Sequence, residues 1–138
     1  AGGFTTLACL CFTDVFSIGA CRYPVTDLID MAKTTHRFEA NYLDYLLGPI
    51  NQNQETYYQR SPLFNINKIN CPVIFFQGLK DKVVLPDQTR NMVESLRKNK
   101  ILTEAHYYEN EGHGFKDSKI KTSVLELTEK FFKKNLAL

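Results

Sequence analysis

Hydrophobic positions follow two rhythms along this chain, and together they predict alternating helices and strands. The first rhythm is the i, i+3, i+4, i+7 spacing of an amphipathic helix, which begins near the N-terminus with Phe4, Leu7, Ala8 and Cys11. The same spacing predicts further helices at residues 28–32, 38–46, 86–98 and 118–134. Thr26 or Asp27 is suited to cap the helix at 28–32, and Pro86 is acceptable in a first helical turn.

The second rhythm consists of short, nearly continuous apolar runs, which are typical of buried strands. The clearest run covers residues 72–76, and further strands are expected at 17–22 and 103–109. Strands that alternate with helices predict an α/β fold with parallel strands and right-handed crossovers. The polar residues 51–59 are expected to form a surface loop. Three strands make a thin sheet with an unpaired edge, so either another segment covers that edge or chains pair through it as a homo-oligomer.

Composition is that of one globular domain, with 138 residues, 43% hydrophobic and 23% charged. A net charge of +2 does not indicate a nucleic-acid partner or a membrane surface, and no apolar run is long enough to span a membrane. No secretory signal is visible. The cysteines lie in apolar runs without the Cys-x-x-Cys spacing of zinc sites, which favours reduced thiols, a cytoplasmic location and no bound metal: Cys9, Cys11, Cys21 and Cys71.

Two candidate catalytic residues, Asp81 and His113, each follow a predicted strand and are 32 positions apart. The carboxyl ends of parallel strands meet at one edge of the sheet, where ligands bind, so we expect the two side chains to lie close together. A carboxylate there can hold an imidazole in one tautomer, and the imidazole can then act as a general base near neutral pH. The alternative is that Asp81 begins a turn and His113 is an exposed turn residue.

A nucleophile to match this pair is missing from the sequence. None of the serines stands in a Gly-x-Ser-x-Gly elbow at a strand-to-helix turn: Ser17, Ser61, Ser95, Ser118 and Ser123. Ala1-Gly2 ahead of a helix is what would follow such an elbow if a serine lay immediately before Ala1, whose N–H would then donate to the oxyanion. The alternative is that Gly2 and Gly3 simply begin a frayed helix. The absence of an initiating methionine suggests a fragment or a processed chain.

Six segments, in order along the chain, carry a resemblance to a known family. They are residues 2–4 (Gly-Gly-Phe), 34–39 (Thr-Thr-His-Arg-Phe-Glu), 42–44 (Tyr-Leu-Asp), 58–62 (Tyr-Gln-Arg-Ser-Pro), 71–84 (Cys-Pro-Val-Ile-Phe-Phe-Gln-Gly-Leu-Lys-Asp-Lys-Val-Val) and 111–115 (Glu-Gly-His-Gly-Phe). Together they resemble the C-terminal half of the catalytic domain of the prolyl oligopeptidase family of serine peptidases. The similarity is greatest to the branch of acylaminoacyl-peptidases and dipeptidyl-aminopeptidase-like enzymes.

The resemblance implies that residues 1–138 form the C-terminal part of an α/β-hydrolase fold, with Asp81 and His113 as two members of a Ser-Asp-His triad. It implies an oxyanion-hole role for the Ala1 N–H and makes Tyr23 and Val25 candidates for the pocket that takes the residue before the scissile bond, although both also suit simple packing. The family's nucleophile turn and N-terminal β-propeller are absent from this sequence, so the chain alone is expected to be inactive. The family requires no cofactor.

These inferences favour a fragment of a serine peptidase that cleaves short or N-acylated peptides. Two alternatives remain open, namely an esterase or lipase of the same fold, and a non-catalytic half-domain that oligomerises through its sheet edge. Among the other polar residues, His36 is expected to be structural and His106 has no evident partner. Arg60 either anchors a carboxylate near the site or is an ordinary surface residue.

Overall fold

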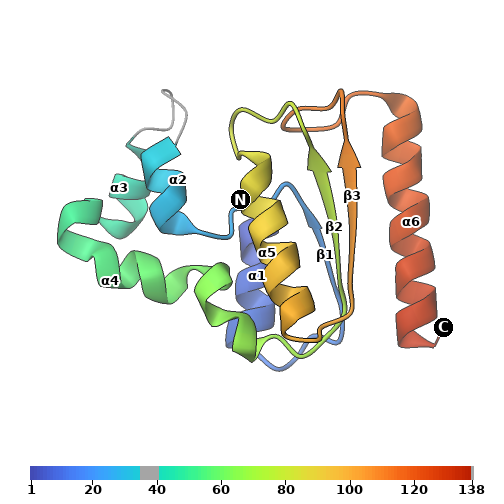
Figure 1. Cartoon of the computed structure of the whole chain (residues 1–138), viewed down its shortest axis with the longest axis horizontal. Coiled ribbons are helices and arrows are strands. Elements are labelled where there is room, and N and C mark those ends of the chain that lie inside the picture. Colours follow the sequence, from blue (N-terminus) through green and yellow to red (C-terminus); the bar gives the residue numbers. More distant parts are fainter. Residues whose placement is uncertain (35–40, 138) are drawn as a thin grey trace.

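The centre of the molecule is a three-stranded parallel sheet, seen in a computed structural model that describes residues 1–34 and 41–137 (Figure 1). The strands lie in the order β1 (Gly19–Arg22), β2 (Val73–Gly78) and β3 (Thr103–Tyr108). The predicted parallel α/β arrangement is therefore confirmed, although the first strand begins two residues later than expected. Gly78 pairs with Tyr108, so β2 and β3 end at the same level and release their following loops side by side.

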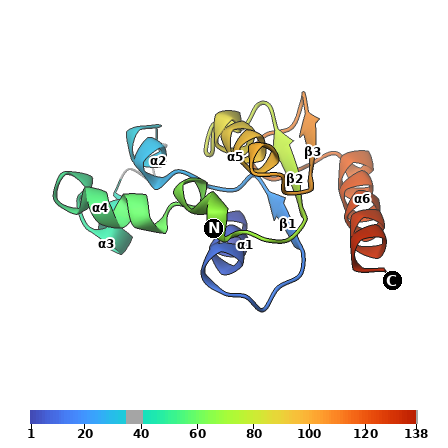
Figure 2. The ribbon, with the colours of Figure 1, turned by 60° about the horizontal axis from the view of Figure 1, so that its bottom comes forward.

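Helices cover both faces of this sheet (Figure 2). On one face lie α1 (Gly2–Phe12) and α5 (Pro86–Lys98), and on the other lies α6 (Ser118–Leu136). Side chains of a strand alternate between faces, and β2 supplies both layers. Its Val73 and Phe75 pack with α1 and α5, whereas Ile74 and Phe76 pack with α6. Because β2 is buried on both sides, its first four residues, Val73 to Phe76, read as a continuous apolar run, and Gln77 follows them as a buried polar residue.

The chain between β1 and β2 forms a helical lobe, which stands away from the sheet (Figure 1). It consists of α2 (Leu28–Thr34), α3 (Tyr42–Leu47) and α4 (Ile50–Arg60), and a 3₁₀ segment, η2 (Pro62–Lys68), leads back to the sheet layer, where Leu63 and Ile66 pack against the core. The buried side chain of Gln88 in α5 attaches the lobe to the sheet layer, since its Oε1 accepts the N–H groups of Thr26 (2.7 Å) and Asp27 (2.8 Å). Asp27 in turn caps α2 by accepting the N–H groups of Ile29 and Asp30, as the sequence predicts.

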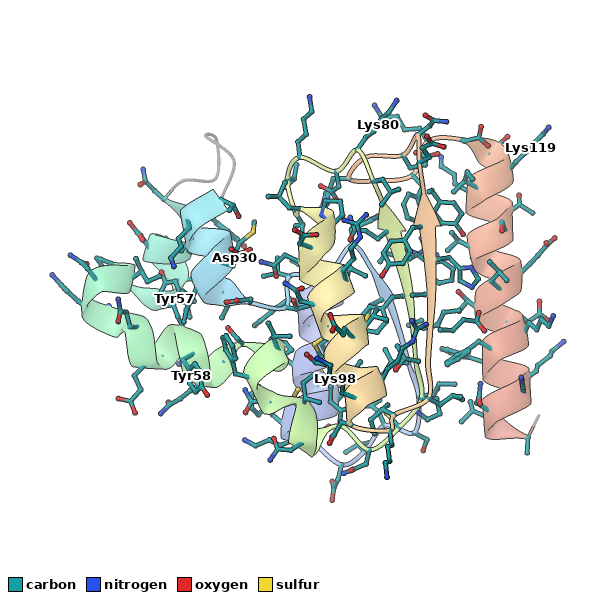
Figure 3. The ribbon with its side chains drawn as sticks, in the orientation of Figure 1. Asp30, Tyr57, Tyr58, Lys80, Lys98 and Lys119 are labelled. Atoms are coloured by element: carbon teal, nitrogen blue, oxygen red, sulfur yellow. The ribbon has the colours of Figure 1, made fainter. Side chains whose placement is uncertain are left out.

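The prediction of a surface loop at residues 51–59 is wrong, because these residues form most of α4. Glutamine and glutamate favour helices, but only Tyr57 of this helix is buried, so no apolar stripe marks it in the sequence. Figure 3 shows Tyr57 on the side of α4 that faces α2. Its hydroxyl donates to the carbonyl of Gly48, just before the helix begins, at 2.7 Å.

Two further expectations concern the helices predicted at residues 38–46 and 118–134. Of the helix predicted at 38–46, α3 is present from Tyr42, and Phe38 lies outside the described residues. The last helix begins where expected, with the Asp117 carboxylate accepting the N–H groups of Lys119 and Ile120. Within the described part of the chain, no helix combines the length and apolarity that a membrane crossing requires.

Candidate active site

The carboxyl ends of all three strands meet at one edge of the sheet, where Tyr23, Asp81 and His113 lie on consecutive loops. A backbone hydrogen bond joins the loop after β2 to the loop after β3, since the Lys80 N–H donates to the carbonyl of Glu111 at 2.9 Å. Figure 3 places Lys80 beyond the arrowhead of β2, at the same end of the sheet as the loop after β3. The predicted convergence at this edge is therefore what the fold produces.

Asp81 and His113 form a hydrogen bond, with 2.9 Å between Oδ2 and Nδ1. The Asp81 side chain is fully buried, whereas that of His113 is 30% exposed. A carboxylate only accepts, so Nδ1 carries the ring proton and Nε2 is left as the basic nitrogen. The pair therefore has the geometry of a general base whose tautomer is held by an acid.

The Asp81 carboxylate is held on both of its oxygens. Oδ1 accepts the N–H groups of Val83 at 2.9 Å and Val84 at 2.8 Å, which is the aspartate turn favoured at such positions. Oδ2 accepts from Gln77 Nε2 at 3.3 Å in addition to His113. These four donors supply the hydrogen bonds that a charge buried away from water requires.

The His113 loop is braced by the buried carboxylate of Glu111, which accepts the N–H groups of Lys116 (3.0 Å) and Asp117 (2.9 Å). The strand end at Gly78 packs directly on this loop, because a Cβ added there would lie 2.3 Å from the Glu111 carbonyl oxygen. Only glycine permits that approach. The two loops that carry the acid and the base therefore behave as one unit.

Tyr23 lies against the imidazole, with ring centroids 4.4 Å apart and an interplanar angle of 51°. It also makes an edge contact with Phe115, at 5.3 Å between centroids. Its backbone φ of +39° is rare for a residue with a side chain, and its N–H donates to the Phe76 carbonyl at 2.8 Å. Tyr23, expected as a pocket residue, contacts the His113 ring but does not line the cavity beside it.

A largely apolar cavity of about 590 Å³ opens beside His113. Val25 and Ala1, the N-cap residue of α1, line it together with His113 and Arg60. The apolar part of the lining comes mainly from the helical lobe and the loop after Asp81: Leu28, Met31, Tyr42, Leu43, Leu46, Leu47, Val83 and Val84. The residues predicted from widely separated parts of the sequence, Ala1, Val25 and His113, therefore border one space.

The sequence contains two other histidines, His106 and His36. His106 does have a partner, because its Nε2 lies 2.7 Å from Glu104 Oε2 two residues earlier on the same face of β3, and its ring stacks on Phe76. That pairing is local and leaves His106 outside the cavity lining. His36 lies outside the described residues.

The cysteines are free thiols that serve as packing residues. Burial raises the pKa of the Cys11 thiol to about 11 and also raises the pKa of Cys21 and of Cys71, so these thiols are protonated at neutral pH. Among residues 1–34 and 41–137, no group of three or more histidine, cysteine, aspartate or glutamate side chains is arranged to hold a metal ion.

Two residues at the site were not singled out from the sequence, namely Gln77 and Thr89. Both are fully buried, and the Thr89 hydroxyl donates to Gln77 Oε1 at 2.6 Å. Their signal was available, since each is polar within a segment predicted to be buried, and buried polar groups need partners. The sequence does not show that they partner each other, or that Gln77 reaches Asp81.

Comparison with known proteins identifies the family and the relatives of this protein. The family model described as the prolyl oligopeptidase family, peptidase S9, matches residues 1–138. The chain belongs to the prolyl oligopeptidase family. The dipeptidyl peptidase family member 6 of Caenorhabditis elegans is 26% identical over 120 residues, which is 82% of this chain and 16% of that protein.

Solved structures of prolyl oligopeptidase relatives superpose closely. A puromycin-hydrolyzing peptidase of Mycobacterium tuberculosis is 38% identical with a TM-score of 0.96, over 99% of this chain and 21% of that one. A puromycin hydrolase is 33% identical with a TM-score of 0.95 and the same coverage. The acylaminoacyl peptidase of Pyrococcus horikoshii, at 19% identity and a TM-score of 0.87 over 97% of this chain and 22% of that one, shares the fold. The expected part of an α/β-hydrolase fold is thereby confirmed, and the chain spans about a fifth of these structures.

Proposed function

We propose that this chain supplies the acid and the base of a serine peptidase triad. The carrying observation is the 2.9 Å bond between Asp81 and His113, on adjacent loops at the carboxyl edge of a parallel sheet. The nucleophile is a serine that immediately precedes Ala1 in a longer protein. In support, Ala1 is the N-cap residue of α1 and borders the same cavity as His113.

The chemistry follows from these positions. The serine Oγ attacks the substrate carbonyl carbon while His113 Nε2 takes the hydroxyl proton, and Asp81 stays ionised and stabilises the imidazolium. The Ala1 N–H, left without an intrahelical acceptor at the start of α1, donates to the oxyanion. His113 then returns the proton to the leaving amine, and water releases the acyl group by the reverse sequence.

The substrate is a short or N-acylated peptide whose residue before the scissile bond is apolar. This part of the proposal rests on the cavity beside His113, whose volume of about 590 Å³ lies in the range of small-ligand sites and whose lining is mostly aliphatic. Val25 contributes to that lining. Peptide substrates are favoured over esters because the solved relatives above 30% identity are named as a peptidase and as puromycin hydrolases.

A fluorophosphonate probe tests the nucleophile. The longer protein should be labelled at the serine before Ala1, and the 138-residue chain should not be labelled. Labelling of the chain at one of its own serines would refute the assignment. Comparing a peptide with an ester of the same acyl group on the longer protein then separates a peptidase from an esterase, while a longer protein that is never labelled and hydrolyses neither points to a non-catalytic domain.

A further inference from the structure

A buried hydrogen-bond network lies behind Asp81, on the side of β2 that packs on α5. Thr89 in α5 donates its hydroxyl to Gln77 Oε1 at 2.6 Å. Gln77 Nε2 donates to the Gly78 carbonyl at 3.0 Å and to Asp81 Oδ2 at 3.3 Å. Gln77 and Thr89 are both 0% exposed.

The surrounding groups allow only one orientation of the Gln77 amide in this network. The two groups that face the Gln77 amide nitrogen, the Gly78 carbonyl and the Asp81 carboxylate, only accept hydrogen bonds. Turning the amide over would put its oxygen against both acceptors, so the nitrogen must point to Asp81. The Gln77 oxygen then needs a donor, and the Thr89 hydroxyl provides it.

The apolar setting makes these polar residues conspicuous. Val73 and Phe75, which share the Gln77 face of β2, pack with Met92 and Val93 of α5 in the main core cluster. An apolar residue at position 77 would continue that packing without the need for partners, because buried polar groups lose free energy unless they are hydrogen-bonded. A role at Asp81 accounts for their presence.

This hydrogen-bond network affects the orientation of the Asp81 carboxylate. Rotation about the Cβ–Cγ bond turns both carboxylate oxygens together, so it would move Oδ1 away from the N–H groups of Val83 and Val84 and Oδ2 away from His113. The Gln77 N–H resists that rotation because it holds Oδ2 from the side of β2. We propose that Gln77, backed by Thr89, is a positioning residue that keeps Asp81 Oδ2 directed at His113 Nδ1. This inference rests on the proposed triad.

Kinetics of the longer protein test the proposal through matched variants. Gln77→Met keeps the length of the side chain and removes its donor, and should lower kcat about 10- to 100-fold while KM changes less than about threefold, in line with the loss of groups that orient a catalytic residue. Thr89→Val keeps the shape and removes the hydroxyl, and should lower kcat about 3- to 10-fold on the same reasoning. Thr89→Ser retains the hydroxyl and should restore most of the rate.

A control separates orientation from general loss of stability. Thr128→Val makes the same chemical change in α6, where the hydroxyl donates to the Val124 carbonyl at 2.7 Å, and should leave kcat unchanged. The proton on His113 Nδ1 gives a second readout, because its downfield NMR resonance should shift in Gln77→Met and in Thr89→Val but not in Thr128→Val.

The outcomes distinguish this inference from the triad itself. If Asp81→Asn and His113→Ala abolish turnover while folded Gln77→Met keeps wild-type kcat and an unmoved Nδ1 resonance, the positioning role is refuted and the triad stands. If Gln77→Met fails to fold, Thr89→Val decides, and equal rates for Thr89→Val and Thr89→Ser refute the role. If Asp81→Asn keeps full activity, the proposed function itself fails.

Discussion

Replacing Asp81 with asparagine is the sharpest perturbation of the site, because it changes one atom and leaves the shape intact. The N–H groups of Val83 and Val84 both donate to Oδ1, so the asparagine oxygen must take that position. The new NH₂ group then occupies the Oδ2 position, 2.9 Å from His113 Nδ1. It can only donate there, so His113 must accept through Nδ1 and carry its proton on Nε2.

The expected loss can be estimated from this geometry. With the proton on Nε2, His113 cannot take the proton of the serine, and the equivalent change in other triads lowers kcat about 10⁴-fold. The new NH₂ group also meets the Gln77 Nε2 donor at 3.3 Å, so one hydrogen bond becomes a donor–donor contact. Losing a partner in a buried site should lower the free energy of unfolding by about 1–3 kcal/mol.

The assay compares the longer protein and its variants on one peptide substrate, with the rate of fluorophosphonate labelling as a second measure. Denaturant unfolding of the same samples supplies the change in stability. Asp87→Asn is the matched control, since the Asp87 side chain is 74% exposed and pairs with Arg90 at the surface. Its rate should be unchanged and its stability should shift by less than about 0.5 kcal/mol. A folded Asp81→Asn enzyme within about tenfold of wild-type turnover would refute the role of Asp81.

Three further predictions concern stability. Gly78→Ala puts a Cβ 2.3 Å from a carbonyl oxygen of the histidine loop and should cost about 1–3 kcal/mol or more, whereas Gly112→Ala, with its nearest contact at 3.7 Å, should cost less in the same denaturant titration. Tyr57→Phe removes the donor of a 2.7 Å bond and should cost about 0.5–1.5 kcal/mol, while Tyr58→Phe on the exposed side of the same helix should change little, both by thermal melts. Burial raises the pKa of the Cys11 thiol from 9.0 to about 11, so above pH 9 the unfolded chain loses this proton first and stability should fall towards pH 11, by at most about 1.4 kcal/mol per pH unit. Cys11→Ala should show a shallower fall, and an unchanged slope would contradict the effect of burial on that thiol.

The sequence determined the sheet and the location of its chemistry. The apolar run of β2 and the 3.6-residue stripes of its neighbours are strong signals, because burial on both faces or on one face leaves a period that can be counted. The positions of Asp81 and His113 after successive parallel strands were sufficient to expect their contact, since parallel strands deliver their carboxyl ends to one edge. The segments that resemble the prolyl oligopeptidase family were sufficient to expect the family, and the family model matches residues 1–138.

Tertiary structure alone decided the parts whose causes lie far apart in the chain. Residues 51–59 form a helix in which Tyr57 is the buried residue, and a single buried residue leaves no period to detect. Tyr23 came to lie on the His113 ring, and Gln77 met Thr89 across the interface between β2 and α5, because packing brought these residues together from separate elements. Hydrophobic period encodes which face of an element is buried, but not which polar atom meets which, and that pairing is what orients the acid and the base.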